Sequence, residues 1–306
     1  MYAYQVYLLR SLKMKVAGFT FIRNAVKNDY PIVEAITSIL PVCDEFVVAL
    51  GNSDDETAEL IQNINSPKIK IINTVWDESL RDGGSVFAAE TDKAFAAISS
   101  DVDWAFYIQG DECVHEKYLP LIKKEMEQNL GNPKVEGLLF KYLHFYGSYD
   151  YVGISSKWYR NEIRIVRNNK SIYSYRDAQG FRKGKDEKLK VKELDAYMYH
   201  YGWVRAPETQ RTKSFYASSF WGGENFDEEK FIKEHNEPFD YSEIDALAEF
   251  DGTHPAVMLE RIKRMNWKFD YDLTYNNLKL KDKAKNLLEK WTGRRFFDYK
   301  NYISVR

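Results

Sequence analysis

Residues 104–112 read WAFYIQGDE, and this stretch decides the expected fold. Its first six residues are a mostly apolar run of the length of a buried strand, and a Gly-Asp-Glu triplet stands where that strand would end. Helix-period segments separate this run from three earlier ones of the same kind. The earlier runs are residues 16–22, 45–50 and 68–76. This alternation predicts an α/β fold, Rossmann-like, with a mostly parallel mixed sheet flanked by helices.

Polar residues follow three of the four predicted strands. Arg23 and Asn24 come after the first, the acidic group around Asp55 after the second, and residues 109–112 after the fourth. Ligands of parallel sheets bind outside the carboxyl ends of the strands, so we expect these side chains to meet at one cleft. Carboxylates in that position suit Mg²⁺ or Mn²⁺ on a diphosphate. Taken singly, acidic residues at a helix start also complement the helix dipole, and Gly-Asp is common in turns.

The pattern changes after residue 135. Longer strands are predicted at 135–146, 163–167 and 193–204, followed by helices at 207–221, 227–235, 255–267 and 276–291. We therefore divide the chain into three parts: residues 1–13 as a leader or disordered segment, 14–205 as the α/β core, and 206–306 as a helical C-terminal extension.

Composition and missing motifs exclude several classes of protein. The chain of 306 residues has 44 Lys and Arg against 46 Asp and Glu, which excludes a general nucleic-acid binder. Two cysteines cannot form a disulfide scaffold. The GxGxxG, GxxxxGK[ST], HExxH and GxSxG motifs are absent, which removes the main support for dinucleotide-binding enzymes, P-loop NTPases, zinc proteases and serine hydrolases. No apolar run reaches the length of a membrane span, and the N-terminus lacks signal-peptide features, so we expect a cytoplasmic protein.

The order of these motifs resembles the family 2 glycosyltransferases of bacterial type, which have the GT-A fold. The resemblance covers residues 14–205 and is clearest over 16–115. The DxD-type motif of the family corresponds to residues 109–112, and residues 199–205 (YHYGWVR) resemble its HYG-type segment. Two features depart from the family pattern. Gln109 stands where the first Asp of DxD is usual, and Leu50-Gly51 replace the acid that commonly reads the base.

The resemblance implies a metal-dependent, inverting transfer of a sugar from a nucleotide-sugar donor to a hydroxyl acceptor, in surface glycan biosynthesis. It implies Mn²⁺ or Mg²⁺ as cofactor, held by Asp111 and His200; a packed core histidine is the alternative for His200. The partners implied are the donor and a glycan or lipid-linked acceptor, and no nucleic acid. We place the nucleotide-sugar at Arg23, Asn24, Asp55, Gln109, Asp111 and Arg205.

An inverting transfer needs a general base for the acceptor hydroxyl. We predict Asp177, which follows the Arg-rich strand at 163–167, with Asp150 and Glu162 as rivals. A surface Asp paired with a neighbouring Arg is the alternative explanation. Trp158, Trp203 and Trp221 are candidates for a sugar-stacking platform.

Two further questions stay open at this level. The Lys-rich helix at 279–290 suits docking onto the body of the protein, or a weak contact with an anionic membrane, which would make the protein peripheral at the inner face. The rival functions are a non-catalytic nucleotide- or sugar-binding protein on the same fold, and a nucleotidyltransferase.

Overall fold

The computed structural model describes residues 14–77, 79–80, 82–222, 226–292 and 299–305. The predicted leader at residues 1–13 lies outside the described residues. Four parallel strands form one half of the main sheet, in the order β3-β2-β1-β4. Their bounds are β1 (Val16–Ile22), β2 (Glu45–Leu50), β3 (Ile69–Asn73) and β4 (Trp104–Tyr107). This half confirms the predicted alternation of strands and helices.

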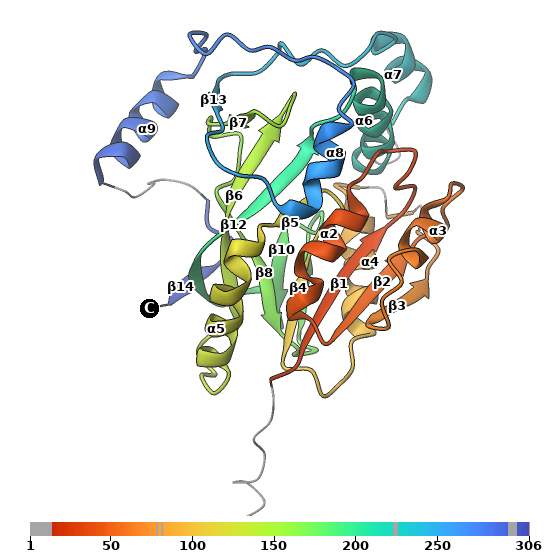
Figure 1. The fold of residues 1–306 in the computed structure, drawn as a ribbon, viewed down its shortest axis with the longest axis vertical. Helices are drawn as coiled ribbons and strands as arrows, with labels where there is room; N and C mark the ends of the chain where they lie inside the picture. Colours follow the sequence, from red (N-terminus) through yellow and green to blue (C-terminus); the bar gives the residue numbers. More distant parts are fainter. Residues whose placement is uncertain (1–13, 78, 81, 223–225, 293–298, 306) are drawn as a thin grey trace, which may run out of the picture.

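Helices cover both faces of these strands (Figure 1). Because successive strand residues point to opposite faces, Val16 packs in the cluster with α2, whereas Ala17 and Phe19 pack with α4. Pro31 stands directly before α2, where its missing N–H has least effect on the helix. The helices of this half are α2 (Ile32–Ile39), α3 (Thr57–Gln62), α4 (Ser85–Ala96) and α5 (Leu119–Asn129), with short 3₁₀ turns η1 (Leu40–Val42) and η2 (Glu116–Tyr118).

Antiparallel pairs extend the sheet beyond β4 and make it mixed. Here β8 runs antiparallel to both β4 and β6, while β12 runs parallel to β6 and antiparallel to β5. These strands are β5 (Glu112–Val114), β6 (Gly137–Tyr146), β7 (Tyr151–Gly153), β8 (Asn161–Arg167), β12 (Lys190–Trp203), β13 (Leu247–Glu249) and β14 (Ile303–Val305). A small separate sheet contains β9 (Ile172–Tyr175), β10 (Gly180–Lys183) and β11 (Glu187–Lys188). The predicted fold class, a GT-A-type α/β fold, is confirmed by this architecture.

The C-terminal part contains helices joined by irregular segments, and its strands β13 and β14 pair with β7 and β12. Its helical elements are α6 (Pro207–Trp221), α7 (Glu228–Glu234), η4 (Ala256–Met258), α8 (Leu259–Lys263) and α9 (Leu280–Thr292). The helix predicted at 255–267 is shorter, because Pro255 has an extended backbone and the helix ends at Lys263. Figure 1 shows α6 beside the carboxyl ends of the parallel strands, where Phe220 contacts the Trp76 ring at a centroid distance of 5.2 Å. This contact fixes α6 over the end of the sheet.

The solvent side of α9 carries several apolar residues. Leu280 is 85% exposed and Trp291 is 86% exposed. The docking of α9 onto the body of the protein and its weak contact with a membrane both stay predictions. Within the described ranges, each helix is too short or too polar to cross a membrane. The division of the chain at residue 205 likewise stays a prediction.

Candidate active site

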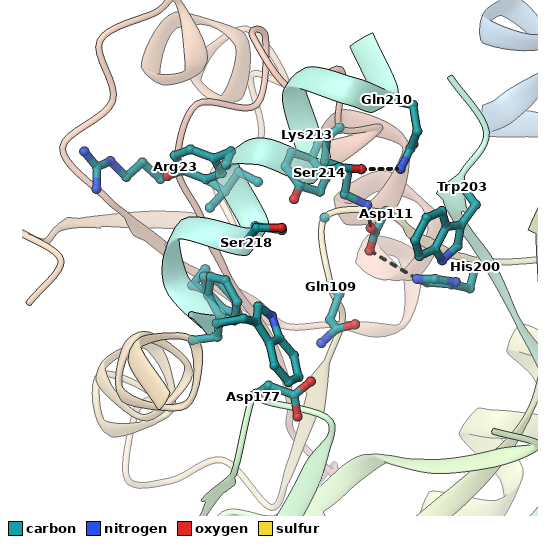
Figure 2. A pocket seen from close by; sticks show the side chains of 18 of the residues that line it. Arg23, Gln109, Asp111, Asp177, His200, Trp203, Gln210, Lys213, Ser214 and Ser218 are labelled. Atoms are coloured by element: carbon teal, nitrogen blue, oxygen red, sulfur yellow. Dashed lines mark hydrogen bonds and ion pairs between the residues drawn. The ribbon is translucent and has the colours of Figure 1, made fainter. Parts of the chain in front are cut away.

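A cavity of about 410 Å³ lies at the carboxyl ends of β1 and β4, and α6 covers it (Figure 2). It brings together residues that are far apart in the sequence. From the predicted set it is lined by Arg23, Gln109, Asp111, Asp177, His200, Trp203 and Trp221. The convergence follows from topology, since parallel strands end at the same edge of a sheet. Asn24, Asp55 and Arg205 are not among the lining residues.

Asp111 follows β4 and is almost buried. Its Oδ2 accepts a hydrogen bond from the Lys213 ammonium at 3.0 Å, and its Oδ1 lies 3.8 Å from His200 Nε2. Burial alone would raise the pKa of this carboxyl, but the charges of Lys213 and Arg205 hold the pKa well below its ordinary value. Burial lowers the pKa of the Lys213 ammonium to about 8, so it stays protonated at neutral pH. Asp111 and Lys213 therefore form an ion pair with little exposure to water.

The protonation of His200 follows from its neighbours. His144 Nε2 lies 2.8 Å from the backbone oxygen of Tyr159, which can only accept, so this nitrogen carries the proton. His144 Nδ1 is then an acceptor, and His200 Nδ1, 3.0 Å away, donates to it. Burial lowers the pKa of both imidazoles, which keeps them neutral. His200 consequently presents an unprotonated Nε2 toward Asp111.

Gly202 makes this close approach sterically feasible. A Cβ at this position would lie 2.5 Å from His200 Nε2 and 3.1 Å from Asp111 Oδ2. Any larger residue would therefore push the imidazole ring and the carboxylate apart. The Gly of the HYG-type segment thus has a steric reason in this chain.

Asp177 lies in the turn between β9 and β10, across the cavity from Asp111 in Figure 2. Burial raises the pKa of its carboxyl above the ordinary value. The adjacent Arg176 and Ala178 both have left-handed backbones, with φ of 55° and 64°. Such conformations cost energy in residues other than Gly and concentrate at functional sites. The strained turn aims a partly desolvated carboxylate at the cavity.

Two anchors hold this turn against the end of β4. Gln109 Nε2 donates to the backbone oxygen of Ala178 at 3.2 Å, and Arg164 Nη1 donates to that of Gln179 at 3.0 Å. Arg164 also forms a buried, bidentate ion pair with Glu112, at 2.9 Å and 2.8 Å. Glu112 in turn accepts from the backbone N–H of Gln109 at 3.1 Å. The turn and the QGDE segment are thus parts of one hydrogen-bonded network.

The two rival candidates for the base lie elsewhere. Asp150 is exposed and accepts a hydrogen bond from Ser148 at 3.1 Å. Glu162 is buried beside a larger groove, and burial raises the pKa of its carboxyl to about 8. Neither lines the cavity that contains Asp111. The assignment of Asp177 as base stays a prediction.

Asn24 and Asp55 contact backbone groups instead of the cavity. Asn24 Oδ1 accepts from the N–H of Asp54 at 3.0 Å, which ties the end of β1 to the end of β2. Asp55 accepts from the N–H groups of Lys27 and Thr57, at 2.9 Å and 3.0 Å. The second of these bonds is made to Thr57, the first residue of α3. Contact of these two side chains with a nucleotide-sugar stays a prediction.

The two arginines of the predicted site differ in exposure. Arg205 is fully buried under the cavity and donates to the backbone oxygens of Asn28 and Gly202 at 2.8 Å and 2.7 Å. Arg23 lies at the rim, with its guanidinium carbon 5.5 Å from the centre of the Trp76 ring. Only Arg23 of the two lines the cavity.

Sequence reasoning missed the contribution of α6. One face of this helix lines the cavity, at Gln210, Lys213, Ser214, Tyr216, Ala217, Ser218 and Trp221. The signal was present, because these positions follow the three- and four-residue spacing of a helix and directly succeed the HYG-type segment. Of the three predicted stacking tryptophans, Trp203 and Trp221 line the cavity, whereas Trp158 stacks on His144 with centroids 5.1 Å apart.

A divalent cation fits this site poorly. Asp111 and His200 supply two ligand atoms, but Lys213 already neutralises the single carboxylate. Within the part of the chain that the structure describes, no three His, Cys, Asp or Glu side chains gather as a metal site. The assignment of Asp111 and His200 as metal ligands stays a prediction.

Comparison with known proteins gives similarity to solved structures only. No protein-family model and no curated protein matches the chain. TarS of S. aureus is 14% identical over 72% of this chain and 42% of its own, with a TM-score of 0.39. Glucosyl-3-phosphoglycerate synthase from Mycobacterium tuberculosis, in complex with Mn²⁺, UDP and phosphoglyceric acid, is 17% identical over 43% and 44% of the two chains, with a TM-score of 0.30.

Mannosyl-3-phosphoglycerate synthase from Rubrobacter xylanophilus is 18% identical over 44% of this chain and 42% of its own, with a TM-score of 0.30. The chain thus spans less than half of the length of each of these three proteins. At such identities the likeness concerns the fold alone.

Proposed function

We propose that the protein is a glycosyltransferase that moves a sugar from a nucleotide-sugar to a hydroxyl acceptor with inversion. One observation carries the proposal. A single cavity has a cationic end, where Lys213 and the buried Arg205 stand near the one carboxylate of Asp111, and a partly desolvated carboxylate, Asp177, on its other side. Such a transfer needs both features, because the donor leaves as an anion and the acceptor hydroxyl must lose a proton.

The chemistry assigns a role to each side of the cavity. The cationic end holds the diphosphate and stabilises the negative charge that grows on it as the bond to the anomeric carbon breaks. The acceptor oxygen forms the new bond to that carbon and passes its proton to Asp177. The raised pKa of Asp177 makes this carboxylate a better base than an exposed Asp. The rings of Trp203 and Trp221 offer apolar faces to a sugar.

The sequence predicts Mn²⁺ or Mg²⁺ as cofactor, and no step of this mechanism depends on either. A cation would supply positive charge to the diphosphate, and Asp111 and His200 would be its ligands. Four further statements rest on the sequence alone and remain proposals. They are the role in surface glycan assembly, the lipid-linked or glycan acceptor, the cytoplasmic or peripheral location and the division at residue 205.

A thermal-shift screen tests the function. We expect one class among UDP-, GDP-, CMP- and dTDP-sugars to raise the melting temperature, since a ligand that binds only the folded state stabilises it. Incubation with that donor should then release free nucleotide, faster when an acceptor is present. Stabilisation without turnover over any acceptor panel would favour the non-catalytic binding protein. Stabilisation by nucleoside triphosphates and not by nucleotide-sugars would favour the nucleotidyltransferase.

A further inference from the structure

We propose that the ammonium group of Lys213 binds the donor diphosphate in the place of a divalent cation, so that the protein binds its nucleotide without metal. This inference rests on the proposed function, because it concerns the same cavity. It also replaces the metal that the sequence predicts at Asp111 and His200 by a side chain of the protein itself.

The position of Lys213 supports this role. Its Nζ donates to Asp111 Oδ2 at 3.0 Å and to the backbone oxygen of Gly202 at 2.8 Å. Asp111 and His200 are the two side chains that the sequence predicts as cation ligands, and His200 Nε2 lies 3.8 Å from Asp111 Oδ1, so the ammonium lies against this predicted pair. An ammonium has three N–H bonds, and two of them make these hydrogen bonds. The third has no hydrogen-bond acceptor among the described residues, with the centre of the Tyr30 ring 5.1 Å from Nζ, and is available for a phosphate oxygen. Lys213 lines the cavity, and its side chain is only 14% exposed.

The charge of the site explains why a lysine suffices. Two cations, Lys213 and Arg205, stand near one carboxylate, Asp111, so the site is positive before any ligand binds. Arg205 is fully buried and donates to backbone oxygens, and its Nη2 has no hydrogen-bond partner among the described residues. A divalent ion would add two positive charges to this surplus, at a cost that low exposure to water increases. A diphosphate would neutralise the surplus.

The family pattern is consistent with this charge balance. A DxD motif supplies two carboxylates to offset a divalent ion, whereas this chain has Gln109 at the first of the two positions. In the structure, Gln109 turns to Ala178 and leaves Asp111 as the single carboxylate of the QGDE segment that faces Lys213. One carboxylate matches one ammonium.

Calorimetry with nucleoside diphosphates tests the inference. The full chain, treated with EDTA, is titrated with UDP, GDP, CDP and dTDP, and each titration is repeated with Mn²⁺. We expect the binding nucleotide to have the same Kd within about two-fold in both conditions. Lys213→Met, which keeps the stem and removes the charge, should weaken binding in EDTA by roughly 10- to 100-fold, as expected for a charged hydrogen bond. Lys230→Met, at an exposed position on α7, is the matched control and should bind like wild type.

Each other result overturns the inference in a distinguishable way. Binding by wild type only with Mn²⁺ would refute the role of Lys213 and leave the proposed transferase intact. Unchanged affinity of a folded Lys213→Met variant in EDTA would refute it as well. If no nucleotide binds in either condition, the inference falls together with the proposed function. The wild-type comparison does not depend on the variant, so it decides even if Lys213→Met fails to fold.

Discussion

The side chain of Gln109 donates a hydrogen bond to the backbone oxygen of Ala178 at 3.2 Å. The bond joins the segment after β4 to the strained turn that carries Asp177. The residue that departs from the DxD pattern therefore connects the donor end of the cavity to the predicted base. Its amide N–H is required for this bond, because a carboxylate has no N–H to donate to a backbone oxygen.

Replacing Gln109 should affect turnover more than donor binding. Gln109→Leu keeps a similar size but loses the donor to Ala178, so the turn loses one of its two anchors. We expect kcat to fall roughly 10- to 100-fold, since small misplacements of a catalytic group have effects of that size. Steady-state kinetics would show the fall in kcat, and calorimetry an unchanged donor Kd. Gln128→Leu, on the exposed face of α5, is the control. A changed donor Kd with unchanged kcat would instead place Gln109 on the nucleotide.

Asp177→Asn tests the general base directly. Loss of a base typically costs on the order of 10²–10⁴ in rate, whereas donor binding uses groups at the other end of the cavity. We therefore expect turnover to fall by that factor, with donor affinity and melting temperature close to wild type. Transfer at a near wild-type rate would show that Asp177 is not the base, and Asp150 and Glu162 would be tested next.

Glu162 should make stability depend on pH. Burial raises its pKa from 4.5 in the unfolded chain to about 8 in the fold, and its Oε2 has no hydrogen-bond partner among the described residues. Because the pKa of Glu162 is higher in the folded state, the folded protein binds this proton more tightly than the unfolded chain does. The resulting stabilisation is complete below pH 4.5 and is lost as the pH rises toward 8. The loss approaches about 1.4 kcal/mol per pH unit for one such group.

Glu162→Gln removes this titration while keeping the shape of the side chain. Melting curves between pH 5 and 8 should show the wild type losing stability relative to the variant as the pH rises. Glu229→Gln, at an exposed position on α7, controls for the loss of a carboxylate. A difference between wild type and Glu162→Gln that stays constant across this range would contradict the raised pKa.

The Asp111–Lys213 pair should be energetically coupled. Asp111→Asn leaves a buried ammonium without its carboxylate, and Lys213→Met leaves a buried carboxylate without its ammonium. Each single variant should therefore be less stable than the double variant, because the double variant leaves neither member of the pair as an unpaired buried charge. A double-mutant cycle by urea denaturation should give a coupling free energy of about 1–3 kcal/mol. Additive effects would mean that the pair contributes little.

The sequence allowed the sheet to be predicted because its signals are local. Apolar runs such as residues 16–22 and 45–50 became β1 and β2 with the predicted bounds. The convergence of Arg23, Gln109 and Asp111 followed from a general property of parallel sheets. These inferences need only strand direction and not the packing of distant elements.

The remaining parts of the site depend on tertiary packing. Lys213 reaches Asp111 because aromatic contacts such as Trp76–Phe220 fix α6 over the sheet, and no local pattern encodes that placement. The same holds for Asn24 and Asp55, whose side chains suited a ligand in the sequence but bind neighbouring backbone groups in the structure. A polar side chain in a loop can bind a ligand or a neighbouring backbone group, and the position of the surrounding backbone decides which of the two it binds.

The antiparallel ladder between β5 and β12 pairs Glu112 with His200, two residues far apart in the chain. A pairing of such long range closes only after much of the intervening chain is ordered, and contacts of this kind form slowly. The cationic end of the cavity is therefore expected to be among the last parts to assemble. During refolding from urea, nucleotide binding should recover with the slowest phase, after the far-ultraviolet signal. Ligand binding would then report the completion of folding, and a preparation that binds nucleotide stoichiometrically would be one in which this ladder has closed in every molecule.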